Sequence, residues 1–195
     1  MTAIETRRSI RKYSNRPVEK EKIEEILRAG TLAPSSKNRQ PWKFIVVTGD
    51  SKEELTGAME QGLERERSAP LLPENEPYLS AARHTANIMK QAPVIILIVN
   101  SLGIDLHADL MPEDRIYEIC NVQSIGAAIE NMTLTAADLG LGSLWICDTY
   151  FAYQELTDWL HTDGELMAAL AIGWPEETPS ARPRHTIEQV AEWRG

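Results

Sequence analysis

Three arginines and a serine occupy four of five neighbouring positions near the N-terminus: Arg7, Arg8, Ser9 and Arg11. If the first helix continues through Arg11, then Arg8 and Arg11 lie three residues apart and share one helix face. Arginine binds phosphate through two parallel hydrogen bonds, so such a cluster with a hydroxyl beside it is typical of a phosphate pocket. The same residues could instead form a solvated basic face near acids such as Glu5.

A second polar segment follows about twenty residues later, with the sequence Pro-Ser-Ser-x-Asn-x-Gln-Pro-Trp over residues 34–42. Pro34, Ser35, Ser36 and Asn38 place hydroxyls, an amide and backbone N–H groups on a tight turn. Such groups can hydrogen-bond the edge of a heteroaromatic ring. The alternative is a turn that only links a helix to a strand.

Both segments must be positioned by the elements around them, which we predict from hydrophobic periodicity and turn residues. We expect helices over residues 2–9, 18–32, 51–67, 79–91, 114–139, 153–160 and 187–193, and strands over residues 43–48, 93–99, 143–147 and 166–174. Helices and strands do not alternate regularly, which favours an α+β fold in one domain, residues 1–195. Residues 68–77, rich in proline and acids, form a surface loop and a candidate lid.

The longest predicted helix carries one apolar stripe at steps of three or four residues. Its members are Ile119, Val122, Ile125, Ile129, Met132, Ala136 and Leu139. A stripe of this length suits a central core helix or a dimer interface. Glycines at positions 140 and 142 end the helix.

Composition narrows the class of protein. A net charge of −9 over 195 residues argues against nucleic acid as the main partner, because phosphate backbones attract basic proteins. The longest apolar run, residues 93–99, is too short to span a membrane, and the N-terminal residues show no signal-peptide stretch. Cys120 and Cys147 have no zinc-site spacing, so we expect reduced thiols and a cytoplasmic location.

The histidines give no sign of a metal site or of a catalytic triad. They stand at positions 84, 107, 161 and 185, on different predicted elements and without ligand spacing. No G-x-S-x-G motif accompanies the serines. We therefore expect no metal.

With both polar segments in view, the chain resembles the nitroreductase family of FMN enzymes. The pattern R-R-S-I-R-x-Y, a helix, then A-P-S-S-x-N-x-Q-P-W and a strand is specific in combination. Residues 131–143, which end in L-G-L-G-S, resemble the family's core helix, and residues 171–175 resemble its late strand. Arg184, or less well Arg182, matches its basic C-terminal residue. The resemblance extends over nearly the whole chain.

The resemblance implies a central, mostly antiparallel sheet flanked by helices and an intertwined homodimer, with FMN at the subunit interface. The matches of Arg7, Arg8, Ser9 and Arg11 would hold the phosphate, ribityl chain and pyrimidine edge, and Arg184 would reach the phosphate. Pro34, Ser35, Ser36 and Asn38 would come from the other subunit and face the flavin ring. Ile146 and Cys147 would pass their backbone beside the flavin N5 edge.

The resemblance also implies an activity. NADH or NADPH would reduce the flavin, which would then reduce a small acceptor such as a nitroaromatic, a quinone or a free flavin in a ping-pong reaction. The cofactor carries the chemistry, so we name no catalytic side chain. Two alternatives remain: another flavin task, such as dehalogenation or flavin destruction, and a flavin-binding protein without efficient turnover.

The chain departs from the family pattern at three places. Cys147-Asp148 stands where the family commonly has Gly-Gly or Glu-Gly, and Ser124 stands where it often has an acid. Residues 60–80 do not align with a family substrate lid.

Overall fold

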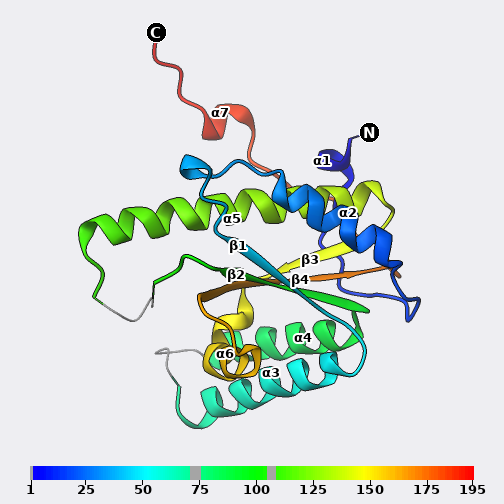
Figure 1. Cartoon of the computed structure of the whole chain (residues 1–195). Coiled ribbons are helices and arrows are strands. Elements are labelled where there is room, and N and C mark those ends of the chain that lie inside the picture. The colour runs from blue at the N-terminus through cyan, green and yellow to red at the C-terminus, as the bar shows by residue number, and fades with distance from the viewer. Residues whose placement is uncertain (1, 71–75, 105–108) are drawn as a thin grey trace.

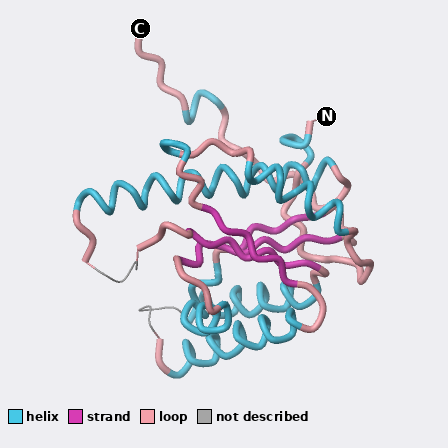
Figure 2. Tube along the Cα trace, in the orientation of Figure 1, coloured by secondary structure: helices cyan, strands magenta, loops and turns pink. Residues whose placement is uncertain are grey.

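The protein is built on one sheet between two layers of helices (Figures 1 and 2). The computed structural model describes residues 2–70, 76–104 and 109–195. The four strands are all antiparallel to their neighbours and lie in the order β1-β2-β4-β3. Their bounds are β1 Trp42–Val47, β2 Val94–Asn100, β3 Gly142–Ile146 and β4 Glu165–Gly173. The expected α+β fold with an antiparallel sheet is confirmed.

Helices cover both faces of this sheet (Figure 1). One layer contains α2 (Lys20–Thr31) and α5 (Pro112–Asp138), and the other contains α3 (Ser51–Ser68), α4 (Glu76–Gln91) and α6 (Tyr153–Leu160). Shorter elements are α1 (Ala3–Thr6), α7 (Ile187–Val190) and the 3-10 turns η1 (Ser36–Asn38) and η2 (Asp148–Ala152).

Strand β2 explains why the core divides into two clusters. All seven of its residues are buried, as expected for a strand covered on both faces. Successive side chains point to opposite faces, so Ile95 and Leu97 pack in the cluster with α3 and α4. Ile96 and Ile98 pack in the other cluster, with α2 and α5.

The long helix α5 begins at Pro112, two residues before the predicted start. Its apolar stripe is divided. Ile125 and Ile129 are buried against the sheet, whereas Ile119 and Val122 are 52% and 43% exposed. The stripe therefore serves the core of the chain only in its C-terminal half, and its N-terminal half presents apolar side chains to the surroundings.

The first helix is shorter than predicted, which changes the geometry of the arginine segment. Helix α1 ends at Thr6, and Arg7 already has an extended backbone, with φ −53° and ψ 134°. The helix predicted over residues 2–9 is therefore too long, and the condition under which Arg8 and Arg11 would share a helix face, a helix that continues through Arg11, is not met. Pairing with distant strands replaces the helix: Ser9 forms a parallel bridge with Ser143, and Tyr13 forms an antiparallel bridge with Pro175.

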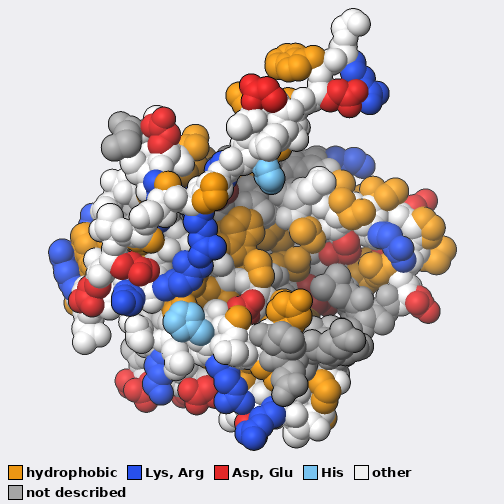
Figure 3. Space-filling view, turned by 180° about the vertical axis from the view of Figure 1, so that it is seen from behind, with side chains coloured by type: hydrophobic (Ala, Val, Ile, Leu, Met, Phe, Trp, Pro, Cys, Tyr) orange, Lys and Arg blue, Asp and Glu red, His pale blue; other side chains and the backbone are white. Residues whose placement is uncertain are grey.

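Two surface segments also differ from expectation. Helix α3 runs to Ser68 and α4 begins at Glu76, so most of residues 60–80 are helical. Five of the ten residues of the candidate lid, 71–75, lie outside the described residues. Residues 181–195 are all exposed and project from the body of the molecule as an arm that includes the short helix α7 (Figures 1 and 3).

Candidate cofactor site

A cavity of about 440 Å³ collects the basic residues singled out in the sequence. Its lining residues include Arg7, Arg8, Ser9, Arg11, Arg182 and Arg184, together with residues 179–181. Segments from the two ends of the chain therefore meet in one place, although they are more than 160 residues apart. Figure 3 shows a run of basic side chains beside an apolar area near the root of the C-terminal arm.

The guanidinium groups in this cavity are held by main-chain carbonyls. Nη1 of Arg8 donates to the carbonyl oxygens of Glu5 and Arg7, each at 2.8 Å. Nη1 of Arg11 donates to the carbonyl of Ser9 at 3.2 Å, and Nη1 of Arg184 donates to the carbonyls of Arg182 and Pro183. Within the described ranges, no carboxylate pairs with any of these three arginines. Their positive charge remains available for an anion.

Arg7 has a different environment from the other three. Its Nε lies 3.4 Å from Oε1 of Glu130 on α5 but makes no hydrogen bond there. Glu5, the acid that lines the cavity, directs its carboxylate to the backbone N–H of Thr2 at 2.9 Å. Neither acid cancels the charge of Arg8 or Arg11.

The arginine segment is fixed along β3. The N–H of Ile10 donates to the carbonyl of Ser143 at 2.9 Å. A Cβ on Gly142 would lie 2.8 Å from side-chain atoms of Ile10, so only glycine permits this approach. On the other side, the N–H of Arg11 donates to Oε1 of Glu177 at 2.5 Å. Sequence reasoning missed Glu177, because no motif marks it.

The Pro-Ser-Ser turn forms a separate part of the molecule and does not line the arginine cavity. Lys37, Asn38 and Gln40 all have left-handed backbones, with φ of 52°, 54° and 48°. Such strain in residues other than glycine persists only where the surroundings enforce it, and it clusters at functional sites. Pro34, Ser36 and Asn38 are exposed, and Ser35 is half-buried.

Two serine hydroxyls hold this turn. Oγ of Ser35 accepts from the N–H of Gln40 at 3.0 Å. Oγ of Ser124 on α5 accepts from the N–H of Ser36 at 3.3 Å. The departure at Ser124 noted in the sequence therefore has a structural role, which the sequence did not reveal.

The third predicted part of the site lies at the far end of β3. Ile146 is buried and ends the strand, whereas Cys147 is exposed and precedes η2. Cys147 follows Ser143, which lies beside the arginine segment, by four positions, and four steps of extended chain correspond to about 13 Å. A ligand that contacts both ends of β3 must be elongated.

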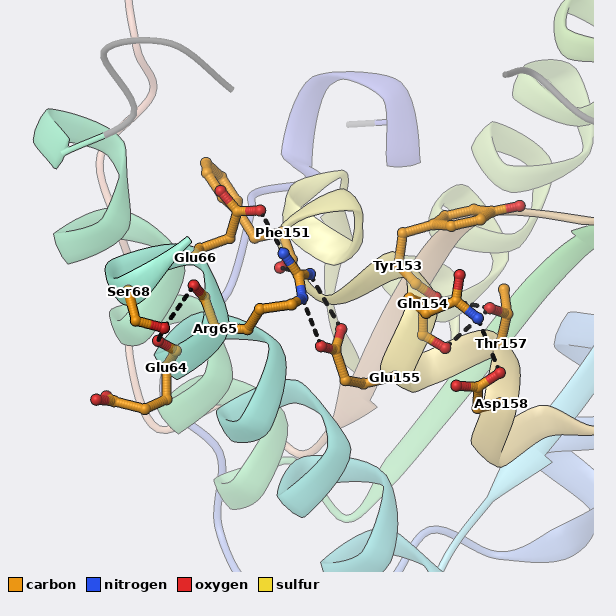
Figure 4. Close-up of polar contacts among 10 residues, drawn as sticks. All are labelled: Glu64, Arg65, Glu66, Ser68, Phe151, Tyr153, Gln154, Glu155, Thr157 and Asp158. Carbon is orange, nitrogen blue, oxygen red and sulfur yellow. Dashed lines mark hydrogen bonds and ion pairs between the residues drawn. The ribbon is translucent and has the colours of Figure 1, made fainter. Parts of the chain in front are cut away.

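Helix α3 anchors η2 through Arg65 (Figure 4). Nε and Nη2 of Arg65 donate to the two carboxylate oxygens of Glu155 on α6, at 2.6 and 3.1 Å, and Nη1 donates to Glu66 at 2.7 Å. Nη2 also donates to the carbonyl of Phe151 in η2 at 3.2 Å. The hydrogen bonds from Arg65 hold the pKa of Glu155 below its ordinary value.

The described residues contain no group of three or more histidine, cysteine or acidic side chains that could hold a metal ion. No helix in that part of the chain is long and apolar enough to cross a membrane. The candidate site therefore consists of three parts: the arginine cavity, the strained turn and the Cys147 end of β3.

Comparison with known proteins identifies the family. A model of the nitroreductase family matches residues 4–174. A protein of Methanothermobacter thermautotrophicus, provisionally named NADH dehydrogenase/NAD(P)H nitroreductase, is 32% identical over 93% of this chain and 80% of its own length. The 5,6-dimethylbenzimidazole synthase of Rhodospirillum rubrum is 29% identical over 88% of this chain and 79% of its own length.

A solved structure supports the same assignment. A provisionally named nitroreductase of Desulfovibrio desulfuricans, crystallised in complex with FMN, is 29% identical and has a TM-score of 0.72. The alignment covers 99% of this chain and 95% of the other. The chain therefore belongs to the nitroreductase family.

Proposed function

We propose that this protein is an FMN-dependent oxidoreductase that uses NADH or NADPH to reduce nitroaromatics, quinones or related acceptors. The observation that carries the proposal is the arginine cavity, in which the guanidinium groups of Arg8, Arg11 and Arg184 form no ion pair with a carboxylate of the described residues. A phosphate monoester carries the charge and the acceptor oxygens that such a cavity requires. The FMN complex of the Desulfovibrio relative supports the choice of cofactor.

In this proposal the chain binds and orients the cofactor along β3. Arg8, Ser9 and Arg184 hold the phosphate and ribityl chain, and Arg11 lies toward the pyrimidine edge, where its charge stabilises the reduced flavin. The backbone at Ile146 and Cys147 contacts the ring at the other end of the strand. FMN supplies the hydride and electron chemistry when it is bound, so the protein needs no acid–base side chain.

The strained turn belongs to the same proposal as the contribution of a second subunit. Pro34, Ser35, Ser36 and Asn38 do not reach the arginine cavity of their own chain, so we assign them to the flavin of a partner in a homodimer. The exposed apolar half of α5, which includes Ile119 and Val122, offers an interface of suitable character. We place this homodimer in the cytoplasm, since both cysteines are free thiols.

A test of turnover follows directly. Under anaerobic conditions, NADH or NADPH should bleach the visible absorbance of the FMN-loaded protein, and a nitroaromatic or a quinone should restore it. FMN that binds but stays oxidised with both nucleotides would contradict the proposed activity and favour a flavin-binding protein without turnover.

The Rhodospirillum relative supports a second candidate, in which the reduced flavin itself is consumed. This candidate predicts that admitting oxygen to the reduced protein destroys flavin in proportion to the nucleotide oxidised. The oxidoreductase proposal predicts full recovery of FMN absorbance over repeated cycles. Chromatography of the released flavin after each cycle separates the two.

A further inference from the structure

Asp148 directly follows Cys147 at the end of β3, where the proposed function places the flavin ring. A charged side chain at this position can therefore act on the ring. Its carboxylate is tied to α4, in the helical layer against which η2 packs: Oγ1 of Thr85 on α4 donates to Oδ2 of Asp148 at 2.7 Å. This bond joins residues 63 positions apart and sets the direction of the side chain. Neither residue belongs to the set predicted to contact the cofactor.

The negative charge of Asp148 is not neutralised by its neighbours. Across the described ranges, no lysine, arginine or histidine forms an ion pair with it. Arg65, which contacts η2 through the carbonyl of Phe151, directs its other hydrogen bonds to Glu66 and Glu155. Asp148 is also half-buried, which reduces screening by water.

Two neighbouring groups already respond to this charge. Although Cys147 is exposed overall, partial desolvation of its thiol raises the pKa, and the carboxylate of Asp148 raises it further. The pKa of the Tyr150 phenol is raised by burial first and by Asp148 second. Both groups become anions when they lose a proton, so both report a field that opposes added negative charge at this turn.

We propose that Asp148, held in place by the hydroxyl of Thr85, lowers the reduction potential of the cofactor and makes the reduced protein a stronger electron donor. This inference rests on the proposed function, which places the flavin ring at the Cys147 turn. Hydride transfer from NAD(P)H moves two electrons and one proton to the ring and releases NAD(P)⁺. The ring gains one negative charge, which a neighbouring carboxylate disfavours.

Thr85 acts as a positioning residue in this arrangement. Without its hydroxyl, the carboxylate is free to turn into water, where its field on the ring is screened. A lower potential suits acceptors that are hard to reduce, and it makes reduction by NAD(P)H less favourable.

The first test measures the potential of FMN bound to the full-length protein, by spectroscopic titration against a reference dye. In Asp148→Asn, the ratio of reduced to oxidised FMN at a fixed potential should rise about tenfold, which equals about 30 mV for a two-electron couple. Asp50→Asn is the matched control: it removes an equal charge at the exposed start of α3, about 20 Å along the helix from Arg65. A ratio that changes equally in both variants, or in neither, would overturn the proposal.

A double variant tests the role of Thr85. Thr85→Val keeps the shape of the side chain and removes its hydroxyl. In that background, Asp148→Asn should change the ratio by much less than tenfold. An undiminished tenfold change would show that Thr85 does not position the carboxylate.

The second test needs no cofactor and therefore separates a failure of this inference from a failure of the proposed function. In full-length Cys120→Ser protein, Cys147 is the remaining thiol, and its alkylation rate against pH reports its pKa. Asp148→Asn should shift this profile to lower pH, whereas Asp50→Asn should leave it in place. An unshifted profile would show that the charge of Asp148 does not act on its surroundings at this turn. That result would overturn the proposal, whether or not FMN binds.

Discussion

Replacing Arg65 by methionine should destabilise the protein strongly, although Arg65 lies outside the arginine cavity. Methionine keeps much of the side-chain length but removes all four hydrogen bonds to Glu155, Glu66 and Phe151. Glu66 is 1% exposed and Glu155 is 17% exposed, so both carboxylates lose a cation in a place that water reaches poorly. Breaking a buried ion pair on one side costs about 3–5 kcal/mol.

Because Arg65 itself is 27% exposed, the lower end of that range applies, and we expect a loss of about 3 kcal/mol. Urea unfolding at fixed protein concentration measures it. With a slope of about 2 kcal/mol per molar urea, the midpoint should fall by about 1.5 M. Arg67→Met is the control, since Arg67 and its partner Glu64 are 69% and 64% exposed, and it should cost less than about 1 kcal/mol.

The loss of stability caused by Arg65→Met should become smaller as the pH falls. Arg65 lowers the pKa of Glu155 in the folded state, so the pair stabilises the protein above the ordinary value of 4.5 and loses this contribution as pH falls through the lowered value. The difference between wild type and Arg65→Met should therefore be full at pH 7 and smaller at pH 3–4. A loss below about 1 kcal/mol at pH 7, or a larger loss in acid, would refute this account of the cluster.

Three further predictions concern the cofactor, the packing and the dimer. Arg8→Ala should weaken FMN binding about 10- to 100-fold in a fluorescence titration, the value of a hydrogen bond between charged groups, while Arg67→Ala leaves the affinity unchanged. Gly62→Ala should lower the melting temperature measured by circular dichroism, because its Cβ would lie 2.2 Å from the Cβ of Ala152; an unchanged value would mean that α3 and η2 separate freely. Ile119→Lys should convert the proposed homodimer to monomers in analytical ultracentrifugation, whereas a dimer that stays intact would place the interface elsewhere.

Local patterns in the sequence predicted most of the helices and strands. The apolar run of β2 and the periodic stripe of α5 each demand burial, and both elements lie within two residues of their predicted bounds. The failure at Arg7–Arg11 has a physical reason. Helix formation depends on neighbouring residues, so it can be predicted from a local pattern. The bridge between Ser9 and Ser143 joins segments 134 residues apart, and no local pattern predicts it.

In the candidate site, too, local sequence predicted some features, whereas contacts between distant segments were not predicted. Residue types alone left a basic surface face and a plain turn as alternatives, and the family resemblance predicted a phosphate site and a ring-edge turn. The structure brings Arg8, Arg11 and Arg184 into one cavity. The supporting contacts could not be predicted, because they depend on the packing of distant elements. Glu177 accepts from the arginine segment and Thr85 fixes Asp148, yet neither belongs to a motif.

A crystal structure of the protein with FMN would test the central claim most directly. The account predicts one FMN per chain, with its phosphate within hydrogen-bonding distance of Arg8 and Arg184 and its ring beside Cys147. It also predicts that the turn containing Ser35 and Ser36 reaches that ring from a second subunit. A phosphate bound outside the arginine cavity, or a ring that neither end of β3 contacts, would contradict it.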